Sequence, residues 1–453
     1  MNTEDDTNRT DEPGEQYETV GVTTERVDGP KLAAGRGGFT DDVHKQDLLH
    51  IKVLRSPHAH ARVADMDVSG ARSMDSVHQV LYHENVPRKK YTTAGQGWPE
   101  PSAHDQVMFD KVLRFAGDRV AAVAAESPEK AQRALENIDV EYDVREPILD
   151  PHRARADDAP RIHTDKDPQG IADPDRNVAA ELHAEHGDVE EGFKQADHVI
   201  ENTFEVTKVQ QTPMEPHISI GWMDEDGRLN LRASTQVPYH VRRIVSYVLD
   251  LDVKDIRVNK PRIGGGFGVK QEVLIQDLVG MMAVRTDRPC KLELTREEEF
   301  KASRSRHPYT VTMKTGVDED GTIRANSMQV LSDTGAHGTH GLTVASVTGS
   351  KTIPLYKAEN VLFDATVVYT NHPPAGAYRG YGAPQGFFPL ESHMEEVARA
   401  IGADSVGFRH EHHIDVGDEN VLAVPLGEGG EGPPMVIRSC GLDECIEKGK
   451  RAI

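Results

Sequence analysis

The sequence predicts a mixed protein that combines α/β and α+β regions in more than one domain. Short runs rich in β-branched residues alternate with helix-like segments along the chain, and three glycine- or proline-containing loops each lead into a helical run. With 453 residues, the chain is longer than one ordinary domain. No apolar run reaches transmembrane length and the first residues lack a signal-peptide core, so we expect a cytoplasmic protein without a membrane partner.

The first folded region is expected at residues 19–145, after an acidic, disordered tail at 1–18. Alternating apolar residues predict strands at 48–54, 77–81, 120–124 and 138–142. A helix is predicted between the last two strands, because Ser127 is a good capping residue and Pro128 suits the first helical position. Residues 146–186 are rich in Pro, Asp, Arg and Ala and are expected to form a linker.

A second region is expected at 187–415, with predicted strands at 198–206, 218–222, 229–233 and 255–259. Three loop-to-helix junctions in this region share a pattern of small residues beside one polar or cationic residue, namely Gln236, Lys270 and Arg379. A helix is predicted to open at Pro238 and another to span 273–284. A third follows the last junction, with Phe387, Leu390, Met394, Val397 and Ile401 at helical spacing and Gly402 to end it. Because helix N-termini attract anions, the three junctions together predict a site for a polyanionic cofactor.

The second junction contains four glycines within five residues, Gly264, Gly265, Gly266 and Gly268. Such a cluster indicates either unusual backbone angles or close approach of the backbone to a ligand. Phe267 is the one large side chain in this loop, and we expect it to lie over the bound group. The alternative is a tight turn with a purely structural role.

Charge and cysteine content exclude several classes of function. The chain carries 52 Lys and Arg against 75 Asp and Glu, a net charge of −23, which argues against nucleic acid as a partner. Acidic residues are spread along the whole length, as on the surface of a salt-adapted, halophilic protein. Three cysteines without a Cys-x-x-Cys pair predict neither a disulfide framework nor a cysteine-ligated cluster.

Three motifs occur in the order Ser234-Thr-Gln-Val-Pro, Gly264-Gly-Gly-Phe-Gly-Val-Lys-Gln and Ala377-Tyr-Arg-Gly-Tyr-Gly-Ala-Pro-Gln. In this order the chain resembles the molybdopterin-binding subunit of the xanthine dehydrogenase and aldehyde oxidase family, closest to its bacterial three-subunit, purine-oxidising type. The resemblance implies an α/β hammerhead domain at 19–145 and the first molybdenum-cofactor domain at 187–415. It also implies that 416–453 begins a second cofactor domain, most of which is missing.

The resemblance also implies roles for particular residues. Gln236 is expected to hydrogen-bond a ligand of the molybdenum, Phe267 to pack beside the metal, and Arg379 to lie close to the centre. Gly265, Gly266 and Gly268 are expected to bind the cofactor through their backbone. The implied cofactor is molybdenum-molybdopterin, or its cytosine dinucleotide form. The implied partners are an iron–sulfur subunit with 2Fe-2S clusters and an FAD subunit, in a higher oligomer.

The resemblance further implies a purine such as xanthine or hypoxanthine as substrate. Gln271 lies where purine-oxidising members hydrogen-bond the substrate ring, and Tyr381 lies where they stack an aromatic side chain on it. No arginine occurs near 346–348, where animal xanthine oxidases place a second substrate-binding arginine, so aldehydes and other aromatic N-heterocycles remain open. Gly380 stands in place of the copper-binding cysteine of the carbon-monoxide-oxidising branch, which argues against that branch.

No catalytic residue is assigned within this chain, because the family's general-base glutamate lies in the second cofactor domain. Glu428 and Glu431 resemble that motif only superficially. We therefore expect either a second polypeptide that completes the site or a non-catalytic, truncated or split half. A nicotinamide-binding dehydrogenase fits poorly, because the glycine loop lacks the last glycine of Gly-x-Gly-x-x-Gly.

Three further residues are candidates for a role at or near the site. His337 and His340 are flanked by glycines in a polar loop, which makes them candidates for lining a pocket. Glu215 precedes the first junction by about twenty residues, and a structural role is expected for it.

Overall fold

The computed structural model describes residues 22–95, 97, 101–164, 170–427 and 433–453. The predicted tail at 1–18 lies outside these residues, as do Glu428 and Glu431. The chain divides into two units, 1–38 and 39–453. The first contains α1 (Gly29–Ala33), and the second contains every sheet described below.

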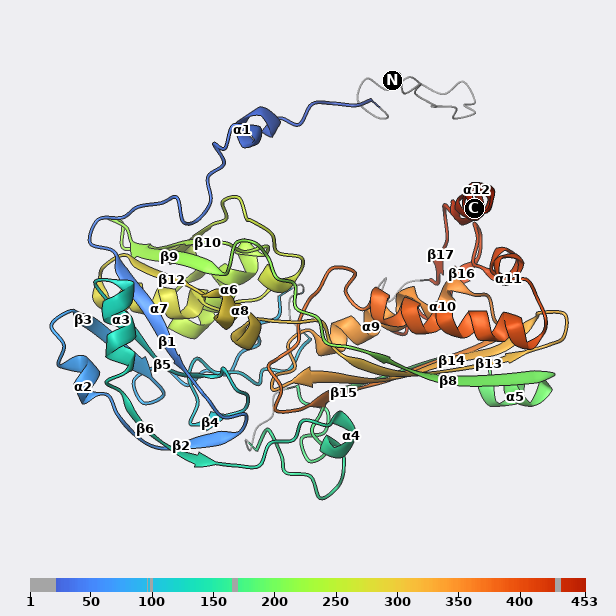
Figure 1. Ribbon diagram of the computed structural model, residues 1–453, viewed down its shortest axis with the longest axis horizontal. Helices are drawn as coiled ribbons and strands as arrows, with labels where there is room; N and C mark the ends of the chain where they lie inside the picture. Colours follow the sequence, from blue (N-terminus) through green and yellow to red (C-terminus); the bar gives the residue numbers. More distant parts are fainter. Residues whose placement is uncertain (1–21, 96, 98–100, 165–169, 428–432) are drawn as a thin grey trace. The chain divides into compact units, whose positions relative to one another are not determined.

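A seven-stranded mixed sheet forms the first half of the larger unit (Figure 1). Its strands, in spatial order, are β11 (Ile256–Asn259), β10 (Leu229–Ala233), β9 (Ile218–Met223), β12 (Cys290–Glu293), β1 (Leu49–Arg55), β5 (Arg119–Ala125) and β3 (Val77–Tyr82). A three-stranded sheet of β4 (Val112–Leu113), β2 (Ala61–Asp67) and β6 (Asp139–Val144) accompanies it. The predicted strands and the helix capped by Ser127 are therefore confirmed within one or two residues at their ends.

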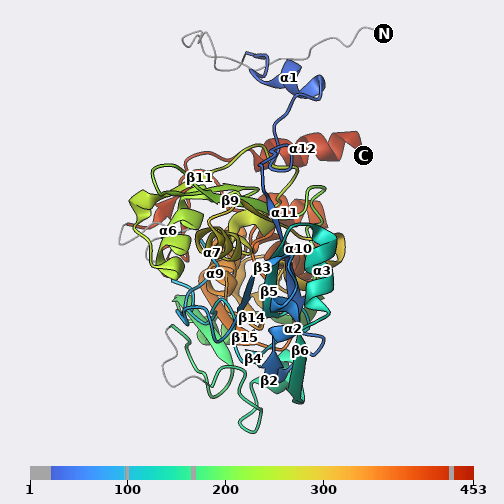
Figure 2. The same ribbon diagram turned by 90° about the vertical axis from the view of Figure 1, so that its left-hand side faces the viewer.

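The seven-stranded sheet crosses the expected boundary between the two sequence regions. Strand β1 pairs in parallel with β12, with Leu49 opposite Cys290, so strands from 19–145 and 187–415 share one sheet. Helices α6 (Pro238–Leu249) and α7 (Gln276–Thr286) cover the β9–β11 half of this sheet (Figure 2). Their apolar side chains and those of β1, β5, β10 and β12 bury one another in a single core.

A five-stranded sheet forms the second half of the larger unit. Its order is β7 (Val178–His186), β15 (Asn360–Tyr369), β14 (Ile323–Gly335), β13 (Tyr309–Val317) and β8 (His198–Val206). Helices α9 (Gly341–Lys351) and α10 (Ala383–Ala400) lie on one face of it, as Figure 1 shows, and enclose the second core. The predicted linker at 146–186 is wrong in its last part, because β7 pairs with β15 over eight residue pairs.

The remaining elements are short. They are α2 (Ser69–Arg72), α3 (Pro128–Leu135), α4 (Pro151–Ala154), α5 (Val189–Gln195), α8 (Arg296–Ala302), α11 (Ser405–His412), α12 (Leu442–Ala452), η1 (Val253–Asp255), η2 (Val269–Gln271), η3 (Ile353–Leu355), β16 (Glu419–Asn420) and β17 (Met435–Val436). None of the helices in the described ranges has the length and apolar character needed to cross a bilayer.

Candidate cofactor and substrate pocket

The glycine loop between β11 and η2 brings its backbone against two other segments. A Cβ added at Gly266 would lie 2.4 Å from Oε1 of Gln236, and one added at Gly268 would lie 2.5 Å from the carbonyl oxygen of Ala377. Gly265 and Gly268 also have φ angles of +99° and +106°, which side chains rarely tolerate. The unusual backbone angles expected of the glycines are present, and the close approach seen is to other segments of the chain; approach to a ligand stays a prediction.

Gln236 is held in one orientation by this loop. Its backbone N–H donates to the carbonyl of Lys270 at 2.8 Å, and its side-chain Oε1 accepts from the N–H of Gly268 at 3.1 Å. Because a backbone N–H can only donate, the amide oxygen faces Gly268 and the NH2 group remains as the donor on the other side. Gln236 thus offers a fixed hydrogen-bond donor to whatever the loop encloses.

Phe267 joins the glycine loop to the third motif. Its carbonyl accepts a hydrogen bond from the backbone N–H of Arg379 at 2.8 Å. Phe267 has φ +52°, a left-handed conformation that is strained for a bulky residue, and its ring is 47% exposed. The surrounding contacts thus fix an exposed aromatic ring on the rim formed by the two loops.

The three motifs enclose one open pocket of about 260 Å³. It is lined by Gln236, Phe267, Gly268, Gln271, Ala377, Tyr378, Arg379, Gly380 and Tyr381. Of the residues that the resemblance assigns to the cofactor or the substrate, all but Gly265 and Gly266 line the pocket, and these two lie in the glycine loop that forms its wall. Segments that are more than 140 residues apart in sequence therefore meet at one place.

Arg379 supplies the positive charge of this pocket. Its side chain is exposed, and no described residue forms an ion pair with it. Its backbone is fixed on both sides, because its N–H donates to Phe267 and its carbonyl accepts from Nη2 of Arg306 at 3.0 Å. A guanidinium placed in this way suits an anionic group in the pocket.

Tyr381 is held by two side chains behind the pocket wall. Its hydroxyl bonds to Nδ1 of His340 at 2.7 Å and to Oγ1 of Thr343 at 2.5 Å. The residue has φ +42° and lies between Gly380 and Gly382, whose φ angles are +93° and +92°. His340 was a candidate for lining the pocket, but it does not line it. It fixes the ring of Tyr381, which does. The glycines that flank His340 are the only sequence signal of this role.

Lys270 does not line the pocket, so the prediction that it provides a cationic group there, at the start of a helix, is wrong. Its side chain is fully buried, and its Nζ donates to the carbonyl oxygen and to Oε2 of Glu215 at 2.8 and 2.9 Å. Burial lowers the pKa of Lys270, and the Glu215 carboxylate opposes that shift. Glu215 also accepts from the N–H of Gly264 at 2.8 Å, which confirms its structural role.

Only two of the three expected helix starts are present at the pocket. Helix α6 begins at Pro238, as predicted, and α10 begins at Ala383, within the third junction and before Phe387, the first residue predicted to be helical. Helix α7 begins at Gln276 rather than at 273, because η2 follows the glycine loop and Glu272 is extended (φ −120°, ψ 163°). The side chain of Glu272 points inward, where it accepts from Oγ1 of Thr93 at 2.7 Å and Nε of Arg304 at 2.5 Å.

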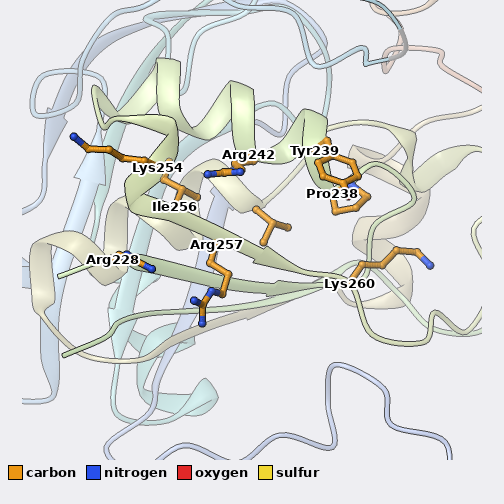
Figure 3. Close-up of a pocket in the computed structure, with 9 residues that line it drawn as sticks. Arg228, Pro238, Tyr239, Arg242, Lys254, Ile256, Arg257 and Lys260 are labelled. Atoms are coloured by element: carbon orange, nitrogen blue, oxygen red, sulfur yellow. The ribbon is translucent and has the colours of Figure 1, made fainter. Parts of the chain in front are cut away.

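A second, more basic pocket of about 360 Å³ lies along α6 and β11 (Figure 3). It is lined by Arg228, Pro238, Tyr239, Arg242, Lys254, Ile256, Arg257, Val258 and Lys260. None of the residues predicted for the cofactor or substrate belongs to it. Strand β11 is an edge strand of the seven-stranded sheet, and charged side chains along an edge prevent pairing with another strand.

Comparisons with known protein families match most of the chain. Residues 34–146 match the family model described as aldehyde oxidase and xanthine dehydrogenase, a/b hammerhead domain, and residues 171–412 match the molybdopterin cofactor-binding domain. These matches confirm the order of the two domains expected from sequence.

Several curated relatives are 33% to 38% identical to the chain over the aligned residues. "Probable hypoxanthine oxidase XdhD" of Escherichia coli (strain K12) is 38% identical over 97% of this chain and 49% of its own length. The xanthine dehydrogenase molybdenum-binding subunit of Escherichia coli O157:H7 is 34% identical over 94% and 55%. The chain thus spans about half the length of these relatives. It matches the nicotinate dehydrogenase large molybdopterin subunit of Eubacterium barkeri at 33% identity over 96% of this chain and 97% of that subunit.

Among solved structures, the aldehyde oxidoreductase from Desulfovibrio gigas superposes with a TM-score of 0.82 and 25% identity. The superposition covers 94% of this chain and 46% of that chain. The arrangement of both sheets is therefore that of a known group of folds.

Proposed function

Because this chain belongs to the xanthine dehydrogenase and aldehyde oxidase family of molybdenum hydroxylases, we propose that its three-motif pocket binds a molybdenum–pterin group and an N-heterocyclic substrate. The convergence of Gln236, Phe267 and Arg379 on one pocket carries this proposal, since the three come from separate loops. The chain itself is then one subunit of an oxidoreductase that hydroxylates a purine-like ring with oxygen derived from water.

The pocket fits an anionic metal–pterin group in shape and chemistry. The loop has no side chains at Gly266 and Gly268, so its backbone packs directly against Gln236 and Ala377 and holds the three motifs close around the pocket. Gln236 presents an oriented NH2 donor, and Arg379 presents a cation that forms no ion pair within the described part of the chain. These are the groups that an anionic ligand requires. When bound, the group supplies the activated oxygen nucleophile and accepts the electrons of substrate oxidation. It is molybdopterin or its cytosine dinucleotide form.

Gln271 and Tyr381 orient the heterocycle in this proposal. Gln271 hydrogen-bonds a ring nitrogen or oxygen, and the ring of Tyr381 stacks on the substrate face. His340 and Thr343 hold the Tyr381 hydroxyl, so the stacking surface is in place before the substrate arrives. Positioning of this kind lowers the entropic cost of the reaction.

Other subunits complete the enzyme. Electrons leave through an iron–sulfur subunit and an FAD subunit. Two observations at the pocket rim support a partner there, namely that Phe267 and Arg379 are both exposed. A third is the likeness over nearly its full length to a protein named as the large molybdopterin subunit of nicotinate dehydrogenase.

A second candidate substrate is a pyridine carboxylate such as nicotinate, or another aromatic heterocycle or aldehyde. The same full-length likeness favours nicotinate, and a carboxylate would pair with Arg379 if the cofactor leaves it accessible. The two candidates differ in charge and ring size, so a substrate panel separates them.

The test is co-expression of this chain with its genomic neighbours and assay of the purified assembly. We expect about one molybdenum per chain and dye reduction that depends on xanthine or hypoxanthine, with little turnover of nicotinate and benzaldehyde. Arg379→Ala and Gln236→Ala should lower the molybdenum content or turnover by at least about tenfold, the effect of one lost charge-assisted contact. An assembly that contains its partners but no molybdenum would contradict the proposal and favour a non-catalytic scaffold.

A further inference from the structure

Three buried side chains from separate segments meet beneath the loop between β14 and α9. A carboxylate oxygen of Asp105 and one ring nitrogen each of His163 and His337 lie within 4.8 Å of one another. The side chains of Asp105 and His337 are only 2% and 6% exposed, and His163 is 5% exposed. We propose that Asp105, His163 and His337 form a binding site for a divalent transition-metal ion, zinc by preference.

The side chains are oriented as metal ligands are. Nε2 of His163 lies 2.8 Å from the carbonyl oxygen of Ala336, to which it must donate, so Nδ1 keeps its lone pair for a ligand. Oδ2 of Asp105 accepts from the N–H of Gly338 at 2.6 Å and from the hydroxyl of Tyr369 at 2.8 Å. Fixing one atom of a ligand by a neighbouring group, while the other faces the ion, is the common arrangement around bound metals.

The distance between two of the ligands suits tetrahedral coordination. Nδ1 of His337 lies 3.4 Å from Oδ1 of Asp105 and makes no hydrogen bond with the described residues. Two ligands at about 2.1 Å from a tetrahedral zinc ion are separated by about 3.4 Å. The three ligand atoms lie within 4.8 Å of one another, so His163 must move inward by up to about 1.4 Å to complete the set. Two imidazoles and one carboxylate are a donor set that zinc accepts.

The charges around the cluster suit a cation. Asp105 supplies a carboxylate beside the two imidazoles. Arg114, whose Nε donates to the carbonyl of Ile162 next to His163, is paired with Asp110 at 3.1 Å.

A cleft of about 20 Å³ borders His337, and neither Asp105 nor His163 lines it. Its volume holds about one water molecule. The arginines that line the cleft are paired with carboxylates and do not repel an ion as free charges would. Their pairs are Arg55–Glu298, Arg119–Asp277 and Arg304–Glu272.

A bound ion would stabilise the loop from Ala336 to His340. Asp105 and His163 hold Gly338 and Ala336 of this loop, and His340 at its end bonds the hydroxyl of Tyr381 in the pocket. Through this loop and His340, the ion would help to hold the ring of Tyr381, which faces the substrate. This consequence rests on the proposed function, whereas the site itself does not.

The experiment uses the tag-free full chain in its assembly, treated with a chelator and then titrated with Zn2+ by calorimetry, with molybdenum measured in the same sample. We expect one zinc per chain and a rise in the thermal midpoint on binding. His337→Gln and Asp105→Asn should each weaken zinc binding by at least about 100-fold, since each removes a direct ligand. His183→Gln is the matched control, because His183 also pairs with a carboxylate, Asp364, at 2.6 Å, but on the surface.

Wild-type protein that binds no zinc at this stoichiometry would overturn the site, and so would unchanged binding in His337→Gln. The wild-type titration decides the matter even if a variant fails to fold. Because molybdenum is measured separately, loss of the zinc site and failure of the proposed function give different results.

Discussion

At Gly268, the addition of a single methyl group tests whether the loop needs its close approach. The variant Gly268→Ala places a Cβ 2.5 Å from the Ala377 carbonyl at a φ of +106°, and we expect a loss of about 1–3 kcal/mol in the free energy of unfolding from strain and more from the clash. Gly417→Ala is the matched control, because Gly417 has φ +98° and no atom within 4 Å of an added Cβ. Urea unfolding and molybdenum content measure both effects. Equal losses in the free energy of unfolding of the two variants would show that the close contact with Ala377 does not matter for stability.

At Tyr381, removal of one hydroxyl tests the role of His340. Tyr381→Phe keeps the ring but loses the bonds to His340 and Thr343, so we expect the KM for the heterocycle to rise about fivefold to tenfold with a smaller change in kcat. Molybdenum content should stay unchanged. Tyr239→Phe, on a ring that is 81% exposed outside this pocket, is the control. A wild-type KM in Tyr381→Phe would show that the hydroxyl does not position the ring.

At the scale of the elements, a buried ion pair fixes the glycine loop against the segment that precedes β9. Glu215→Gln leaves the charge of the fully buried Lys270 unpaired and weakens the bond to Gly264, and we expect a loss of about 3–5 kcal/mol in the free energy of unfolding. The exposed pair Lys301–Glu297 gives the control, since Glu297→Gln should change stability little. Similar urea midpoints for both variants would contradict a structural role for Glu215.

Helix α12 is joined to α11 by a pH-dependent contact. Burial lowers the pKa of His413, but its donation to the Ile414 carbonyl and to Asp443 at 2.7 Å outweighs burial and raises the pKa above its usual value. A raised pKa in the folded state means that this stabilisation is complete below about pH 6.5 and is lost as pH rises through the folded value. Amide exchange in α12 should therefore be faster at pH 8.5 than at pH 6, relative to the intrinsic rates. His413→Gln should remove this difference; its persistence would assign the effect to other groups.

Local patterns predicted most elements because their signals are local. Alternation of apolar residues located β8 at exactly its residues, and Ser127 with Pro128 located the start of α3. The delayed start of α7 was not predictable, because the extended Glu272 depends on contacts with Thr93 and Arg304, which are distant in sequence. The inward direction of Lys270 and the strand β7 in the expected linker likewise depend on distant partners, Glu215 and β15.

Motif order predicted which residues meet in the pocket, since Gln236, Phe267, Gln271, Arg379 and Tyr381 all line it. Their chemical roles stay predictions. The residues that support the pocket were harder to find. His340 and the cluster of Asp105, His163 and His337 come from segments whose contact is visible only in three dimensions.

At the scale of the whole molecule, the two sequence regions are not independent bodies. The pairing of β1 with β12 places strands of the hammerhead domain in the sheet that carries β9 to β11, and β11 leads directly into the glycine loop. The hammerhead domain thus stabilises the base of the pocket. The acidic surface implied by a net charge of −23 remains a prediction of salt adaptation.

The central claim is that a molybdenum ion binds where the three motifs meet. Anomalous diffraction at the molybdenum absorption edge, from crystals of the assembled protein, tests this most directly. The account predicts one strong anomalous peak per chain in the pocket, next to Gln236, Phe267 and Arg379. A molybdenum peak elsewhere on the chain, or none in crystals that contain the partner subunits, would contradict it.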